Sequence, residues 1–262
     1  MADRPLLMSA PMVRATLAGI KSQTRRILNP APRLDHFASE HLEDFELRGF
    51  EVAEQPDGRH LVYRPRWRVG DRAWIRETWQ VARESVDYET GGEYDVFPWN
   101  EAEMGDPRPY LNGCARHGYK AGLFYRADGE DKNPGAFYPL TGLRDEVLRK
   151  AEIDWRPSIH MPRWASRLTL TVSEVRVERL RDISEADAIA EGVSNGMRPD
   201  GSPFWAPPAG FGGTRFIDTA RHAFADLWKT IHGHESWAAN PWVAAISFTV
   251  TPANIDSLPE KA

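Results

Sequence analysis

Hydrophobic and polar residues alternate with a period of two in several segments of the chain, the pattern of half-buried β-strands. The segment 168–172 reads Leu-Thr-Leu-Thr-Val, and the alternation continues through Val175 and Val177. The last apolar segment, 242–250, alternates in the same way. These patterns predict strands at 23–28, from the Gly70-Asp71 turn to Trp79, at 122–127, at 168–177 and at 242–250.

Apolar residues with helical spacing occur in three other segments. In the segment 11–19, Pro11 suits an early helical position and Gly19 is placed to end the helix. In ISEADAIAEG, Ser184 is the expected N-cap and Gly192 lies just past the end. A third helix is expected after a Thr214 cap, and its apolar face consists of Ile217, Ala220, Phe224, Leu227, Trp228 and Ile231.

Alternating strands with few helices predict an α+β fold built on a largely antiparallel sheet or barrel. Long polar stretches rich in glycine and proline separate the regular segments. We interpret these stretches, at about 29–66, 85–150 and 193–215, as insertions into a single domain that spans residues 1–262. A hairpin is expected within the first insertion at Pro56-Asp57-Gly58.

Composition restricts the kind of protein and its partners. The 262 residues are 41% hydrophobic and 27% charged, which is typical of a globular protein with its own core. A net charge of −5 gives no general attraction to nucleic acid, so a polyanion site requires a local basic patch. Cys114 is the only cysteine, which excludes an internal disulfide and a zinc site of several thiolates. We expect a cytoplasmic protein with no signal peptide, no membrane contact, no metal and no cofactor.

The run LAGIKSQTRR at 17–26 follows the first predicted helix and is polar after Ile20. A lysine could activate the Thr24 hydroxyl if its pKa were lowered, and Arg25 and Arg26 would lower the pKa of Lys21. The same cluster could instead hold a phosphate or a carboxylate. It could also be a solvated loop without a function.

Two carboxylates, Glu77 and Glu191, are further candidate functional groups. Glu77 is predicted on a strand face that otherwise carries Ala73, Ile75 and Trp79, so it either lines a cleft or pairs with a buried arginine. Glu191 lies in the last turn of its predicted helix, where the macrodipole disfavours negative charge. This position suits a proton shuttle, although an exposed glutamate without a role is the alternative.

The segment WRPSIHMPRW at 155–164 is predicted to be a loop stiffened by two prolines. Its indoles, together with Ser158, His160 and Arg163, could form the wall of a site for a planar base. A structural loop held by its tryptophans is the alternative.

The order of these motifs resembles the ASCH domain family, and more narrowly its prophage-encoded members. The resemblance is carried by Lys21-Ser22-Gln23-Thr24-Arg25, the Gly70-Asp71 strand with its RETW segment, WRPSIHMPRWASR, DISEADAIAEG and the last apolar strand. It covers roughly residues 8–28, 68–80, 155–192 and 222–250. It implies a PUA-like fold, which is a small curved β-barrel with a cleft beside the first helix.

The resemblance also implies a function. Small bacterial members hydrolyse the acetyl amide of N4-acetylcytidine with a lysine, a threonine and a glutamate, and these correspond to Lys21, Thr24 and Glu191. We therefore expect a hydrolase that acts on a modified nucleobase or nucleoside. In this interpretation the substrate-binding residues are Arg25, Arg26, Glu77, Trp79, Ser158, His160 and Arg163. The alternatives are a non-catalytic RNA, DNA or nucleotide-binding module and a ribonuclease.

Overall fold

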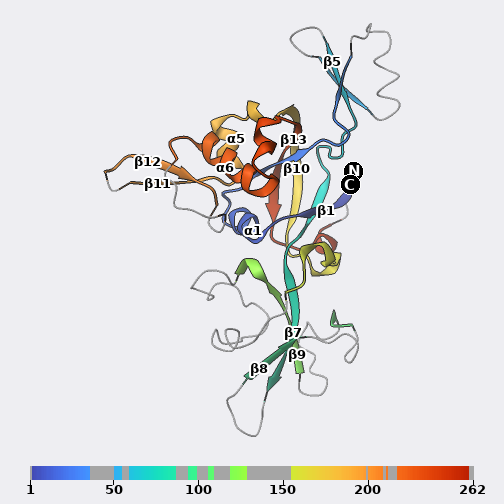
Figure 1. Ribbon diagram of the computed structural model, residues 1–262. Coiled ribbons are helices and arrows are strands. Elements are labelled where there is room, and N and C mark those ends of the chain that lie inside the picture. Colours follow the sequence, from blue (N-terminus) through green and yellow to red (C-terminus); the bar gives the residue numbers. More distant parts are fainter. Residues whose placement is uncertain are drawn as a thin grey trace. The chain divides into compact units, whose positions relative to one another are not determined.

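The computed structural model describes residues 2–35, 50–54, 59–86, 94–98, 106–108, 119–128, 155–198, 200–208, 211 and 217–259 (Figure 1). The chain divides into two compact units. Unit 1 comprises Met1–Arg4, Ala15–Ala73 and Thr169–Pro252, and unit 2 comprises Pro5–Arg14, Trp74–Leu168 and Ala253–Ala262. The elements β1 (Asp3–Leu7), α1 (Ala10–Leu17) and β6 (Arg72–Arg76) run from one unit into the other. A single domain with insertions stays a prediction.

The largest sheet has five strands in the order β1-β6-β10-β13-β2. β10 (Thr169–Arg179) and β13 (Trp242–Thr251) pair antiparallel, with one register shift between Val172 and Glu174. β2 (Gln23–Ile27) pairs antiparallel with the other side of β13. The strands predicted at 23–28, 168–177 and 242–250 are therefore confirmed, as is the mixed α+β class. Closure into a barrel is not confirmed, because this order has β1 and β2 at its two ends in the described part of the chain.

Helices of unit 1 pack beside this sheet. α5 (Glu185–Ala190) and α6 (Ala220–His232) lie next to each other, and α7 (Glu235–Ala238) follows (Figure 1). Ser184 caps α5 as predicted, since its side chain accepts a hydrogen bond from the backbone N–H of Asp187. The predicted start of the third helix is wrong, because Thr219 caps α6 and Ile217 precedes it. Thr214 lies outside the described residues. The buried side of α6 consists of Ala220, Ala223, Phe224, Ala225, Leu227 and Trp228.

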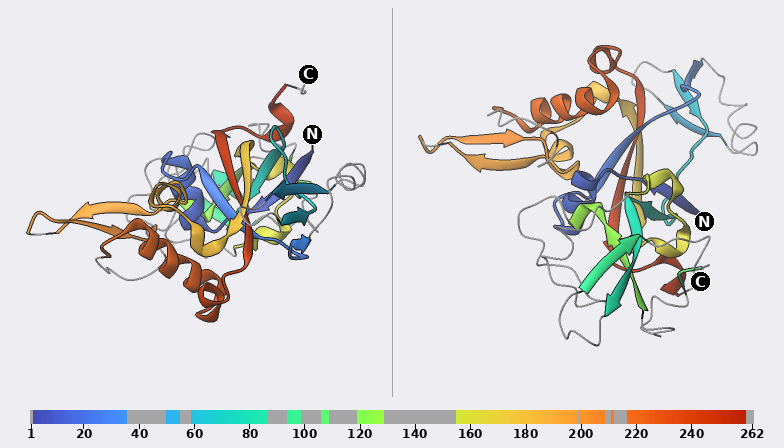
Figure 2. Two further views of the ribbon diagram at one scale, coloured as in Figure 1. Left: turned by 90° about the horizontal axis from the view of Figure 1, so that it is seen from above. Right: turned by 60° about the horizontal axis from the view of Figure 1, so that its bottom comes forward.

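All three predicted insertions contain strands, and the strands of the second belong to the sheet of unit 2. In the first, β3 (Arg33–Asp35), β4 (Glu51–Glu54) and β5 (His60–Tyr63) form a sheet in the order β3-β5-β4. β4 and β5 pair antiparallel, as the predicted hairpin requires, although its turn lies outside the described residues. In the third, β11 (Ser194–Met197) and β12 (Pro203–Ala206) form a hairpin that extends away from α6 in both views of Figure 2.

Unit 2 is built on a sheet in the order β8-β7-β9, with β7 (Trp79–Val86), β8 (Tyr94–Pro98) and β9 (Tyr119–Tyr125). The predicted single strand through Glu77 to Trp79 is wrong, because β6 ends at Arg76 and Trp79 begins a strand in a different sheet. The predicted strand at 122–127 begins and ends earlier, and its last residues belong to η3 (Arg126–Asp128). A buried cluster of Trp79, Val81, Met161 and Ala165 forms the core of this unit.

The loop at 155–164 contains two short 3₁₀ turns, η4 (Ser158–His160) and η5 (Arg163–Ala165). Two further turns of this kind are η6 (Leu180–Asp182) and η7 (Ile255–Ser257). No helix within the described ranges is long and apolar enough to cross a membrane.

Candidate functional site

The turn after α1 places Lys21 against the end of α5. Gly19 adopts a φ of 71°, which ends the helix as predicted, and the backbone N–H groups of Ile20 and Lys21 both donate to Ala15 O. Gly192 adopts a φ of 101°, and a Cβ atom there would lie 3.3 Å from the Cβ atoms of Ala15 and Lys21. Glycine at this position therefore permits the close approach of the two segments.

Lys21 and Glu191, which are 170 residues apart in sequence, form a buried ion pair. Lys21 Nζ lies 2.7 Å from Glu191 Oε2, and the two side chains are only 2% and 4% exposed. The ammonium also donates to the carbonyl oxygens of Gln23 and Glu191, at 2.7 and 2.9 Å. Burial lowers the pKa of Lys21, and the contact with Glu191 opposes this only in part. The expected lowering by Arg25 and Arg26 is present but smaller than the effect of burial.

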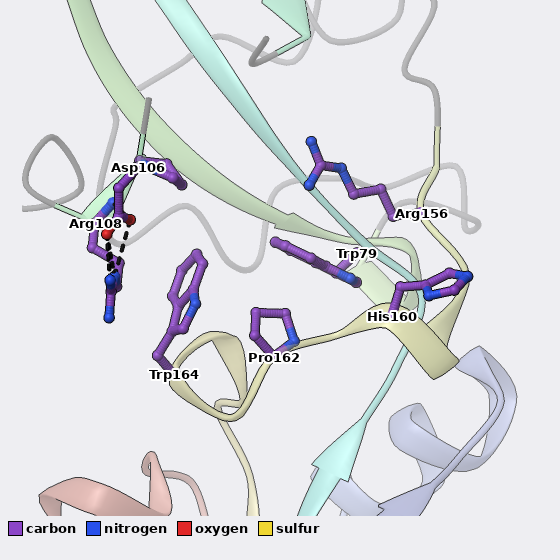
Figure 3. A pocket seen from close by; sticks show the side chains of 8 residues that line it. Trp79, Asp106, Arg108, Arg156, His160, Pro162 and Trp164 are labelled. Atoms are coloured by element: carbon purple, nitrogen blue, oxygen red, sulfur yellow. Dashed lines mark hydrogen bonds and ion pairs between the residues drawn. The ribbon is translucent and has the colours of Figure 1, made fainter. Parts of the chain in front are cut away.

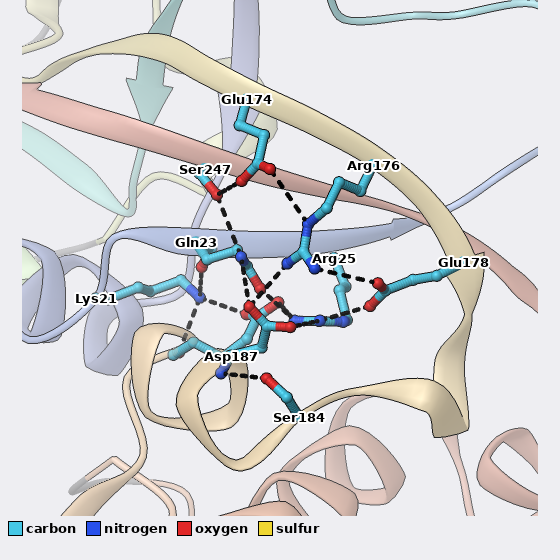
Figure 4. Close-up of polar contacts among 10 residues, drawn as sticks. Lys21, Gln23, Arg25, Glu174, Arg176, Glu178, Ser184, Asp187 and Ser247 are labelled. Atoms are coloured by element: carbon cyan, nitrogen blue, oxygen red, sulfur yellow. Dashed lines mark hydrogen bonds and ion pairs between the residues drawn. The ribbon is translucent and has the colours of Figure 1, made fainter.

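Arg25 joins this pair to a larger charged network (Figure 4). Its guanidinium lies 2.6 Å from Glu178, 3.2 Å from Asp187 and 3.4 Å from Glu191. The side chain of Arg25 is completely buried and its Cζ lies 5.7 Å from the ring centroid of Phe224. Arg25 is thus engaged with three carboxylates and contacts Oε1 of Glu191, whereas Lys21 contacts Oε2.

Asp187 connects the network to the sheet. It accepts a hydrogen bond from Gln23 Nε2 at 3.1 Å and one from Arg176 at 2.8 Å (Figure 4). Although burial acts in the other direction, these hydrogen bonds and that from Ser184 hold the pKa of Asp187 below its usual value. The capping residue predicted for α5 therefore also fixes a carboxylate of the site.

Thr24 and Arg26 lie on β2 opposite Ile246 and Ala244 of β13. Because strand residues alternate in direction, their side chains leave the face that carries Gln23 and Arg25. Thr24 is buried, with 5% exposure, and among the described residues no hydrogen bond joins its hydroxyl to Lys21 or Glu191. Arg26 is partly buried, and this burial lowers its pKa. The structure brings Lys21 and Glu191 together, and among the described residues Thr24 has no hydrogen bond to either.

Unit 2 contains the other sequence-predicted residues. Glu77 is 1% exposed and forms two hydrogen bonds with Arg167, at 2.9 and 3.0 Å. Arg167 also binds Asp128 at 2.7 and 2.8 Å, and its Cζ lies 4.0 Å from the ring centroid of Tyr125. Burial raises the pKa of Glu77, and Arg167 opposes this rise. Of the two alternatives for Glu77, the structure contains the pair with a buried arginine.

Trp79, His160 and Trp164, one of the two indoles of the predicted loop wall, line a pocket in unit 2 (Figure 3). The lining residues that sequence reasoning did not select are Asp106, Pro107, Arg108, Arg156 and Pro162. Ser158 and Arg163 are not among the lining residues, and Arg163 instead forms an ion pair with Asp256 at 2.7 Å. The WRPSIHMPRW motif could also have suggested Arg156 and Pro162, but no local signal pointed to Arg108.

No group of three or more histidine, cysteine or acidic side chains suited to a metal ion occurs in the described part of the chain. Comparison with protein-family models, with curated proteins and with solved structures gave no match. The function must therefore be argued from the two sites themselves.

Proposed function

We propose that this protein is an ASCH-type hydrolase with a PUA-like barrel, and that it removes an acyl group from the N4 amine of a modified cytosine. The observation that supports the proposal most is the buried Lys21–Glu191 pair, with 2.7 Å between its charged atoms and little solvent around it. Thr24, three residues after Lys21, is the nucleophile in this proposal. No metal or cofactor takes part.

The low exposure of the pair is what makes it chemically useful. An ammonium and a carboxylate are both costly to bury, so transfer of one proton from Lys21 to Glu191 yields a neutral amine and a neutral acid. The lowered pKa of Lys21 favours the same transfer. The pair can then supply a general base and a general acid at the same time.

In the first half-reaction, the Thr24 oxygen attacks the acyl carbon while neutral Lys21 takes the hydroxyl proton. The bond between the acyl carbon and N4 breaks, and protonated Glu191 gives its proton to N4. The products are an acyl ester on Thr24 and the free amine of cytosine, and the original ion pair is restored. Water then attacks the ester with the same pair as base and acid, which releases the carboxylic acid and regenerates Thr24.

Arg25 positions Glu191 in this mechanism and does not contact substrate, because its guanidinium is engaged with three carboxylates. Thr24 and Lys21 must form a hydrogen bond when substrate binds. Because the Thr24 side chain leaves the opposite face of β2 from Gln23 and Arg25, this hydrogen bond requires Thr24 or Lys21 to change its side-chain direction when substrate binds.

The proposal is tested by incubating the protein with N4-acetylcytidine and measuring cytidine release by chromatography. We expect turnover by the unmodified protein and a loss of at least about 100-fold in kcat for Thr24→Ala, Lys21→Met and Glu191→Gln. Thr249→Ala is the matched control, since Thr249 is a strand threonine on the exposed side of β13, and it should retain full activity. No cytidine release at an enzyme concentration equal to that of the substrate, or full activity of Thr24→Ala, would refute the proposal.

A further inference from the structure

The side-chain amide of Gln23 is fully engaged within the charged network of unit 1 (Figure 4). Gln23 lies on β2 and is 4% exposed, and its Oε1 accepts a hydrogen bond from Arg25 Nη1 at 2.5 Å. Its Nε2 donates to Asp187 Oδ1 at 3.1 Å and to Ser247 Oγ at 3.2 Å. A neutral side chain therefore connects a guanidinium, a carboxylate and a hydroxyl.

The neighbouring strands fix the direction of this amide. Gln23 lies opposite Ser247 of β13, and Ser247 is paired with Glu174 of β10. Ser247 Oγ donates to Glu174 Oε2 at 3.2 Å, so its hydroxyl hydrogen is used and its oxygen accepts from Gln23. The Asp187 carboxylate is an acceptor as well. Nε2 must therefore face these two groups, which leaves Oε1 to face Arg25.

The guanidinium of Arg25 makes short and long contacts. Nη1 lies 2.5 Å from Gln23 Oε1 but 3.4 Å from Glu191 Oε1. Nη2 lies 2.6 Å from Glu178 Oε1 and 3.2 Å from Asp187 Oδ2. A guanidinium can bind one carboxylate through two short parallel hydrogen bonds, and Arg25 does not bind Glu191 in this way. Its short contacts to Gln23 and Glu178 leave only a long contact to Glu191.

This arrangement leaves Lys21 as the close counter-charge of Glu191, with 2.7 Å between Nζ and Oε2. A second close cation would stabilise the charged form of the carboxylate and make it a weaker proton acceptor. At an effective dielectric constant of about 20, moving Arg25 from 3.4 Å to about 2.8 Å would disfavour protonation of Glu191 about fivefold. Repulsion between Arg25 and Lys21 offsets part of this change, so the net effect is about three- to fivefold.

We infer that Gln23 is a positioning residue, which holds the Arg25 guanidinium away from Glu191 so that Glu191 can take the proton of Lys21. The proton passes from Lys21 Nζ to Glu191 Oε2, and the resulting amine and acid are both neutral. Gln23 contacts neither the substrate nor the proton. The inference rests on the proposed function, because this transfer prepares the base and the acid of that reaction.

Two substitutions of Gln23 test the inference through N4-acetylcytidine hydrolysis. Gln23→Met removes the acceptor for Arg25 at similar volume, so kcat should fall about three- to fivefold while KM stays within about twofold. Gln23→Glu keeps an oxygen that accepts from Arg25, so it should retain at least about half of the unmodified kcat. Gln80→Met is the matched control, since Gln80 is also a strand glutamine that is 4% exposed, and its kcat should be unchanged.

Urea unfolding separates positioning from a structural role. Gln23→Glu places a carboxylate where Nε2 now lies 3.1 Å from Asp187 Oδ1, so it should be no more stable than Gln23→Met. If Gln23 only supported the fold, kcat would follow stability and Gln23→Glu would be no more active than Gln23→Met. The inference predicts that Gln23→Glu is clearly the more active of the two.

Crystal structures of the unmodified protein and of both variants supply a measurement that needs no substrate. In Gln23→Met, the distance between Arg25 Nη1 and Glu191 Oε1 should shorten from 3.4 Å to about 2.8 Å. In Gln23→Glu it should stay close to 3.4 Å. An unchanged distance in Gln23→Met, or a Gln23→Met enzyme with unchanged kcat, would overturn the inference.

Failure of the inference and failure of the proposed function give different results. If the unmodified protein releases no cytidine but the distance in Gln23→Met shortens, the hydrolase function is refuted and the positioning of Arg25 by Gln23 is upheld. If the unmodified protein releases cytidine and Gln23→Met matches it in both kcat and distance, the function stands and the inference is refuted.

Discussion

Replacing Lys21 by methionine removes one partner of the buried ion pair while keeping most of the side-chain volume. The change leaves the Glu191 carboxylate beside the carbonyl oxygens that Lys21 now binds at 2.7 and 2.9 Å. Loss of one partner of a buried pair costs about 3–5 kcal/mol in free energy of unfolding. Arg25 is 3.4 Å from Glu191 and compensates in part, so we expect a loss near the lower end of that range.

The matched control is Lys229→Met, which removes a lysine that pairs with Asp226 at 3.6 Å in a partly exposed position. This pair is worth about 0–1 kcal/mol at most, so the control should be close to the unmodified protein. Urea unfolding followed by far-UV circular dichroism measures both variants. The reasoning is refuted if Lys21→Met lowers the free energy of unfolding by less than about 1 kcal/mol, because a buried carboxylate that has lost its nearest counter-charge should cost more than that.

The difference in free energy of unfolding between the unmodified protein and Lys21→Met should change with pH in a definite direction. Burial lowers the pKa of Lys21 in the folded protein, whereas in the unfolded chain it is about 10.4. Between the two values the unfolded chain binds more protons, so the stability of the unmodified protein rises with pH in this window. Lys21→Met lacks this gain, so the deficit of the variant should grow as pH rises. A deficit that shrinks between pH 7 and pH 10 would contradict the assignment.

Two further predictions concern the Glu77–Arg167–Asp128 network of unit 2 and the packing of Gly192. Arg167→Met leaves the buried Glu77 and the partly buried Asp128 without their counter-charge and should lower the free energy of unfolding by about 3–5 kcal/mol. Glu77→Gln should lower it by about 1–2 kcal/mol, and urea unfolding compares the two variants. Because burial raises the pKa of Glu77, the unmodified protein should gain stability relative to Glu77→Gln as pH falls toward 4. Gly201→Ala should lower the free energy of unfolding by about 1–2 kcal/mol, because its φ of 82° is unfavourable for alanine. Gly192→Ala should lower it further, because a Cβ atom there also meets the Cβ atoms of Ala15 and Lys21. Gly192→Ala should also lower turnover by displacing Lys21, and both glycine variants are compared by unfolding and by cytidine release.

Local patterns were sufficient for elements whose signals lie within a few residues. Ser184 and Gly192 delimit α5 because a cap and a positive φ depend on nearby backbone groups. The β11–β12 hairpin was missed, since its strands lack alternation. Gly196 faces the ring of Phe204 in that hairpin, and a Cβ atom at position 196 would lie 2.5 Å from the ring, a cross-strand requirement that the single sequence does not display.

The candidate sites depend on long-range contacts, and these were harder to predict. Glu191 was grouped with Lys21 only through the ASCH resemblance, because no local rule links it to a lysine 170 residues away. Arg167 was overlooked as the partner of Glu77 for the same reason, as they are 90 residues apart. The strand break before Trp79 was also missed, since Trp79 pairs with Arg156 and with β9 through contacts that a period-two pattern cannot show.

The central claim is that Thr24 attacks the acyl group with the Lys21–Glu191 pair as base and acid. Mass spectrometry of the protein, quenched during a single turnover of N4-acetylcytidine, tests it most directly. The account predicts that one acetyl group is attached to the peptide that contains Thr24, and that Thr24→Ala shows no adduct while Thr249→Ala does. Cytidine release without any acetylated intermediate, or an acetyl group on a different residue, would contradict it.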